Sequence, residues 1–124
     1  MLDHASIGVR DIARARAFYD AVFATIGCKA VYEGDGYAGY GGEAAQFWLN
    51  STDHPVPADL RSGLHFSFVA PSRAAVDAFH AAALAHGGAD NGPPGARPDY
   101  GPNYYAAFAI DLDGYRIEAH TEQS

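Results

Sequence analysis

The chain has 124 residues, 48% of them hydrophobic, which suits a single domain with its own core. Its formal charge is −7 and it has no basic cluster, so nucleic acid and anionic membrane surfaces are poor partners. It has no apolar run that could span a bilayer, no signal-peptide pattern and a single cysteine, so we expect a cytoplasmic protein without an intrachain disulfide.

The first half of the chain predicts a strand, a helix and three further strands. Side chains alternate over His4–Val9 as in a strand. Asp11 is a candidate N-cap for a helix over Ile12–Ile26, which Gly27 ends. Composition and turn signals predict three more strands, over residues 29–33, 37–40 and 46–49.

The second half begins after a linker without periodicity, residues 51–62. A strand is predicted over residues 64–69 and a helix over about residues 74–86. Residues 91–102 are rich in proline and glycine and predict a long loop of the kind that is often functional. Two closing strands are expected around a four-residue turn: residues 104–110 and 115–120, with the turn at 111–114.

A repeat relates the two halves. The spacing that separates His4 from His65 also matches Phe18 with Phe79 without a gap. Further matches at this spacing are Ser6 with Ser67, Ala17 with Ala78, Ala21 with Ala82, Ala24 with Ala85, and Gly27 with Gly88. A fixed spacing indicates one structural unit used twice. We therefore expect an α+β fold of two βαβββ modules that form a curved mixed sheet with helices on its outer face. The expected single domain spans 1–124, with module one at about 1–50 and module two at 63–124.

Two histidines and a glutamate are predicted to share the sheet face that lies opposite the helices. Strand alternation places His4 and His65 on that face. If residues 111–114 form a four-residue turn, Ile110 pairs with Tyr115, and Glu118 then shares its face with Tyr105 and the small side chains of Ala107 and Ala109. Two imidazoles and a carboxylate can bind a divalent transition metal and leave positions open for a substrate. Taken singly, each of these residues is better explained as a structural or solvated side chain.

Three segments carry a family resemblance. They are Asp3-His4 followed by Ala15-Arg16-Ala17-Phe18-Tyr19, the His65 strand, and the closing Asp111-Leu112-Asp113-Gly114-Tyr115-Arg116-Ile117-Glu118. Together they resemble the vicinal-oxygen-chelate superfamily of glyoxalases, bleomycin-resistance proteins and extradiol dioxygenases. The resemblance implies a U-shaped sheet that cups a divalent metal (Fe, Mn, Ni or Zn) held by His4, His65 and Glu118. Trp48 matches the fourth ligand of glyoxalase-type members, and tryptophan cannot ligate, so the set is more similar to that of Fe(II) extradiol dioxygenases.

The leading interpretation is a metal-dependent enzyme that acts on a small oxygenated substrate chelated by the metal. Trp48 and Tyr105 are expected to shape the pocket, and Arg97 and Tyr100 to contact the substrate from the long loop; no catalytic acid or base is assigned. The alternative is a non-catalytic, drug-sequestering protein of the bleomycin-resistance type, in which aromatic side chains stack on the ligand. The resemblance also implies a homodimer, and in some members the modules pair across chains.

Overall fold

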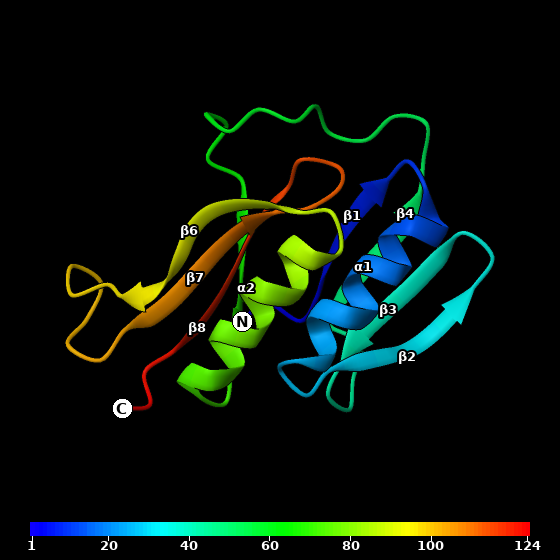
Figure 1. The fold of residues 1–124 in the computed structure, drawn as a ribbon. Coiled ribbons are helices and arrows are strands. Elements are labelled where there is room, and N and C mark those ends of the chain that lie inside the picture. Colours follow the sequence, from blue (N-terminus) through cyan, green and yellow to red (C-terminus); the bar gives the residue numbers. More distant parts are fainter.

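The computed structural model describes all 124 residues as two βαβββ modules, and it confirms the expected fold class (Figure 1). The elements of the first module are β1 (Ala5–Val9), α1 (Ile12–Ala24), β2 (Lys29–Gly34), β3 (Tyr37–Gly41) and β4 (Phe47–Ser51). Those of the second are β5 (His65–Val69), α2 (Arg73–Ala85), β6 (Ala89–Ala96), β7 (Tyr105–Ile110) and β8 (Arg116–Thr121).

Each module forms a four-stranded mixed sheet of the same topology. The strand order is β1-β4-β3-β2 in the first, here sheet A, and β5-β8-β7-β6 in the second, sheet B. In each sheet the first strand runs parallel to the last, and the remaining pairs are antiparallel. Phe18 and Phe79, matched by the repeat, are 1% and 0% exposed on the two helices. The sequence repeat is therefore a repeat of structure.

Side-chain caps begin both helices. The Asp11 carboxylate accepts a hydrogen bond from the backbone N–H of Arg14, and the Ser72 hydroxyl accepts one from that of Ala75, each at 3.1 Å. Such caps satisfy backbone donors that have no partner within the helix. Gly27 ends the first helical segment with a φ of +79°, a left-handed conformation that favours glycine. Neither helix is long and apolar enough to cross a membrane.

The two modules share one core. A single cluster of 21 buried hydrophobic residues draws on both, and α1 and α2 lie side by side between the two sheets (Figure 1). Four phenylalanines join the modules: the ring centroid of Phe68 lies 4.9 Å from Phe23 and 5.1 Å from Phe47, and that of Phe66 lies 5.3 Å from Phe47. Edge-to-face contacts of this kind add to the free energy that burial of the rings contributes.

Polar contacts from the β7–β8 turn also tie the modules together. The Tyr19 hydroxyl on α1 donates to the Asp111 carboxylate at 2.5 Å, and the Tyr115 hydroxyl donates to the carbonyl of Gly8 at 2.8 Å. Burial raises the pKa of Asp111 to about 6. Burial, followed by the charge of Asp111, also raises the pKa of Tyr19. The conspicuous Asp-Leu-Asp-Gly turn thus lies at the contact between modules.

The expected register of this hairpin is wrong by one residue. Ile110 pairs with Arg116, because Tyr115 belongs to the turn. The Asp111 carboxylate accepts from the N–H of Tyr115 at 2.8 Å, and the backbone N–H of Asp111 donates to the carbonyl of Tyr115 at 2.9 Å. A shift of one residue reverses the faces of a strand. Ala107 and Ala109 therefore face α2, and Phe108 lies on the face of Glu118.

The predicted loop over residues 91–102 is only partly a loop, since its first half belongs to β6. This strand is the edge of sheet B and contains Pro93 and Pro94. Proline cannot donate to a sheet ladder, but an edge strand needs donors on one side only. The pairing with β7 shifts at two points along the strand, between Asp90 and Gly92 and between Gly92 and Gly95, which leaves room for the prolines.

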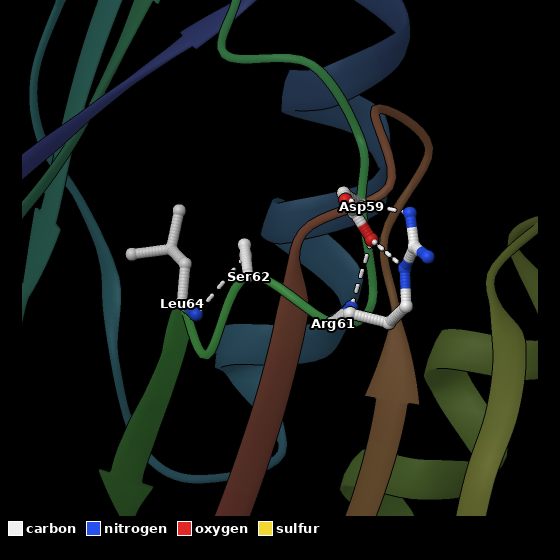
Figure 2. Close-up of polar contacts among 4 residues, drawn as sticks. All are labelled: Asp59, Arg61, Ser62 and Leu64. Carbon is white, nitrogen blue, oxygen red and sulfur yellow. Dashed lines mark hydrogen bonds and ion pairs between the residues drawn. The ribbon is translucent and has the colours of Figure 1, made fainter.

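The linker between β4 and β5 crosses from one module to the other without regular structure (Figure 1). Figure 2 shows the local contacts at its end. The Asp59 carboxylate accepts from the backbone N–H and the Nε of Arg61, at 2.9 and 3.1 Å, and these bonds lower the pKa of Asp59. The Ser62 hydroxyl accepts from the N–H of Leu64 at 3.2 Å. These contacts lead the chain into β5.

Candidate functional site

His65 and Glu118 meet on the open face of sheet B, the face opposite α2. They lie on the neighbouring parallel strands β5 and β8, and His65 Nε2 is 2.7 Å from Glu118 Oε1. The Glu118 side chain is only 4% exposed, whereas that of His65 is 40% exposed. A largely desolvated carboxylate therefore lies under an accessible imidazole. This pair is the strongest candidate for functional chemistry in the structure.

Tyr104 completes the surroundings of Glu118. Its hydroxyl donates to Glu118 Oε2 at 2.6 Å, so both carboxylate oxygens have a partner. Its ring stacks on His120 at 4.8 Å between centroids, and His120 Nδ1 lies 3.2 Å from the hydroxyl of Ser67. Burial and the bond to Glu118 raise the pKa of Tyr104 to about 12. Sequence analysis missed Tyr104 because the expected register put its neighbour Tyr105, rather than Tyr104, on the face of Glu118.

His4 lies apart from this pair. It directly precedes β1, its side chain is 54% exposed, and its Nδ1 lies 2.6 Å from the Asp3 carboxylate. No group of three histidine, cysteine, aspartate or glutamate side chains gathers anywhere in the chain. His4 and His65 nevertheless line the same cavity of about 420 Å³, whose wall includes Phe47. Of the three expected ligands, the structure brings two together.

Trp48 takes the place in sheet A that Glu118 takes in sheet B. Trp48 pairs with Ser6 across β4 and β1, just as Glu118 pairs with Ser67 across β8 and β5. A Cβ atom at Gly39 would lie 2.8 Å from the Trp48 ring, so the ring rests directly on this glycine. Tyr32 stacks on Trp48 with centroids 5.8 Å apart and planes at 15°. Sheet A thus presents an aromatic surface on its open face.

The other expected substrate contacts divide between the two faces of sheet B. The expectation that Tyr105 shares the face of Glu118 is wrong, because the corrected register turns it toward α2. There its hydroxyl donates to Asp77 at 2.6 Å. Tyr100 is exposed and meets Tyr104 edge-on at 5.4 Å. Arg97 lies over the ring of Phe108, with its Cζ 5.3 Å from the centroid, on the face of Glu118.

Comparison with known proteins identifies the family. Residues 1–119 match the model of the Glyoxalase/Bleomycin resistance protein/Dioxygenase superfamily. The chain belongs to this superfamily. The resemblance seen in the sequence is therefore confirmed over almost the whole chain. None of the curated proteins matches it.

Solved structures of the superfamily have the same fold. A glyoxalase/bleomycin resistance protein from Albidiferax ferrireducens T118 is 32% identical, with a TM-score of 0.84 over 95% of this chain and 96% of that one. A glyoxalase/bleomycin resistance protein/dioxygenase family enzyme from Burkholderia phytofirmans PsJN is 19% identical, with a TM-score of 0.72 over 98% of both chains. The fosfomycin resistance protein FosX from Mesorhizobium loti is 21% identical, with a TM-score of 0.70 over 98% of this chain and 91% of that one. At these identities the last two show the fold alone.

The donor atoms of the His65–Glu118 pair suit a divalent transition metal. Imidazole nitrogen and carboxylate oxygen are common ligands of such ions, and here one of each converges on a single point. Tyr104 orients the carboxylate from behind, as outer partners of metal ligands do. Catalytic metal centres commonly have three protein ligands, and within one chain no third donor lies beside this pair.

Proposed function

We propose that the protein is a metal-dependent enzyme of the glyoxalase or dioxygenase type, which acts on a small oxygenated substrate. The contact between His65 and the desolvated carboxylate of Glu118 carries this proposal. A divalent ion such as Fe, Mn, Ni or Zn would act there as a Lewis acid on vicinal oxygens of the substrate. Within the chain, Tyr104 would hold Glu118 in place, because its phenol donates a hydrogen bond to the carboxylate.

The proposed third ligand is His4 of a second copy of the chain. The open face of sheet A presents His4 but has Trp48 where a carboxylate would be needed. The open face of sheet B presents His65 and Glu118 without a third donor. These two incomplete sites complement each other, and a homodimer that joins them would form two complete sites. Trp48 would then lie against the substrate as one wall of the pocket.

Metal content is the first test. Protein purified without a histidine tag or chelator would be analysed by elemental mass spectrometry, beside the His65→Ala and Glu118→Gln variants. We expect near-stoichiometric metal in the wild type and loss of it in both variants. The matched control is His54→Ala, which removes an exposed histidine of the linker. A wild type that takes up no metal on titration, or a Glu118→Gln variant that retains it fully, would overturn the proposal.

A mixing experiment tests the origin of the third ligand. His4→Ala and Glu118→Gln chains would be unfolded together, refolded as a mixture and analysed for metal. If the site forms across chains, each mixed dimer contains one site with both substitutions and one intact site. Mixed dimers should then regain metal that neither parent binds. No regain would exclude His4 of the partner as the third ligand.

The aromatic surface of sheet A favours a second candidate, a ligand-sequestering protein. Tyr32 and Trp48 form a stacked, accessible pair that could hold a planar ligand without a metal. In that case metal-free protein should bind an aromatic ligand and quench the fluorescence of Trp48. Binding would survive Glu118→Gln and disappear in Trp48→Ala. Dependence of all binding on Glu118 would instead favour the enzyme.

A further inference from the structure

Arg97 is an unpaired cation beside the candidate site. It takes part in none of the ion pairs of the protein, although the chain has a net charge of −7. Its guanidinium lies on the open face of sheet B, over the ring of Phe108, and Phe108 is the cross-strand partner of Glu118. An arginine that remains unpaired in such an acidic chain still has the capacity to bind an anion.

Two glycines of β6 make room for the Arg97 side chain. A Cβ atom at Gly95 would lie 3.0 Å from Arg97 Nη1, and one at Gly92 would lie 3.5 Å from Nη2 and 2.9 Å from the Phe108 ring. The side chain therefore folds back along the strand, where Nη2 donates to the carbonyl of Pro93 at 2.7 Å. The backbone N–H of Arg97 donates to the carbonyl of Tyr104 at 2.8 Å. These contacts hold the guanidinium in place before any ligand arrives, which lowers the entropic cost of binding.

The guanidinium also keeps free donors. It carries five N–H groups in a planar fork. One is bonded to Pro93 and another makes a long contact of 3.4 Å with the carbonyl of Ala96, so the others remain for a ligand. Phe108 has both groups as neighbours: its ring centroid is 5.3 Å from Arg97 Cζ and 6.3 Å from the ring centroid of His65. The cation and the His65–Glu118 pair therefore flank the same ring on one face of the sheet.

We propose that Arg97 binds an oxyanion of the substrate, a carboxylate or a phosphonate, while the vicinal oxygens of the same molecule meet the His65–Glu118 centre. This assignment rests on the proposed function and narrows it, because it makes the substrate a small anion. Carboxylates and phosphonates share the geometry that a planar guanidinium recognises with two parallel hydrogen bonds. Phe108 restrains the guanidinium from below by cation–π contact.

The test compares matched ligands on metal-loaded protein by titration calorimetry. 3,4-Dihydroxybutanoate and 2,3-dihydroxypropylphosphonate carry an oxyanion in addition to two vicinal hydroxyl groups, and 3,4-dihydroxybutanamide is the neutral analogue. We expect the wild type to bind at least one oxyanion about 10- to 100-fold more tightly than the amide, since a charge-assisted hydrogen bond contributes about 1.5–3 kcal/mol. The better of the two ligands identifies the class of oxyanion. Arg97→Gln should lose this preference, and Arg97→Lys should retain part of it.

The control is Arg61→Gln, which removes an exposed arginine of the linker and should leave all three affinities unchanged. A wild type without preference for either oxyanion, or an Arg97→Gln variant that keeps the preference, would overturn the role of Arg97. The metal content of each variant is measured in parallel. Metal retained in Arg97→Gln, with the preference lost, separates this role from that of the metal ligands. If protein without metal still prefers the oxyanions, and Arg97→Gln removes that preference, the role of Arg97 is supported. The same result would count against the proposed metal-dependent enzyme.

Discussion

The phenol of Tyr104 and the carboxylate of Glu118 form a 2.6 Å hydrogen bond that fixes one oxygen of the carboxylate and leaves the other directed at His65. Glu118 is thereby held in one orientation by a residue outside the set of expected ligands. The arrangement resembles the outer contacts that set the geometry and basicity of metal ligands in other proteins.

We expect Tyr104→Phe to weaken metal binding without unfolding the protein. The substitution keeps the ring that stacks on His120 and removes only the hydroxyl that orients Glu118. Loss of such a partner costs about 10- to 100-fold in metal affinity. Competition with a chelator of known affinity measures the change. Tyr100→Phe is the matched control and should bind metal as the wild type does; an equal loss in both variants would contradict a specific role for Tyr104.

Gly39→Ala should displace Trp48. The new methyl group would lie 2.8 Å from the indole ring, so the ring must move away from Tyr32. Overpacking of this kind costs about 1–3 kcal/mol. Trp48 is the only tryptophan, so its fluorescence reports the movement without interference. Gly42→Ala provides the control, because a methyl group there meets nothing within 4 Å. An unchanged emission spectrum in Gly39→Ala would show that the ring does not rest on this glycine.

Asp111→Asn should change how stability depends on pH. Burial raises the pKa of Asp111 from its usual 3.8 to about 6, so ionisation of this carboxyl costs the folded state free energy above about pH 6. That cost disappears as the pH falls toward 4. As the pH is lowered from about 7 to about 4, the free energy of unfolding of the wild type should therefore rise relative to that of Asp111→Asn, by up to about 3 kcal/mol.

Denaturant unfolding at a series of pH values measures this difference, and titration of the other carboxyl groups cancels in the comparison. Asp35→Asn removes a carboxyl group at an exposed turn and serves as the control. A difference between Asp111→Asn and the wild type that stays constant with pH would show that burial does not raise the pKa of Asp111.

Phe47→Ala should destabilise both modules together. The ring is 4% exposed and contacts Phe66 and Phe68 of the other module. Removing a buried phenylalanine costs about 3–5 kcal/mol. Thermal unfolding should show one transition at a lower temperature, since the modules share a core. Tyr37→Ala, an exposed aromatic residue of the same sheet, should change the midpoint little. A second transition appearing in Phe47→Ala would mean that the modules unfold independently.

Much of the fold could be predicted because its signals are local. The cap at Asp11 and the glycine that ends α1 lie within a few residues of the structure they determine. The strand β6 could not be predicted, because Pro93 and Pro94 are unfavourable in a strand and are tolerated only at a sheet edge. Composition does not reveal which strand is at the edge.

The site was less predictable because it depends on register. The family resemblance, not the fixed spacing of the repeat, placed Trp48 and Glu118 at equivalent positions, and the register of both sheets agrees. The β7–β8 turn was misjudged by one residue, since the Asp111 side chain adds Tyr115 to it. In the observed register, Tyr105 faces the helix and Phe108 lies on the face of Glu118, beneath Arg97. The ligand role proposed for His4 depends on association between chains, which no spacing within one chain reveals.

The four phenylalanines shared by the two modules bear on how a chain of this kind could have arisen. A half-length ancestor with one βαβββ unit would have left Phe23 and Phe47 in contact with water. A unit of this size would be marginally stable on its own, and association with another copy would stabilise it. Joining two units through the linker makes each the permanent neighbour of the other, independent of protein concentration. In a fused chain the two open faces need not carry the same residues, and here sheet A has Trp48 where sheet B has Glu118.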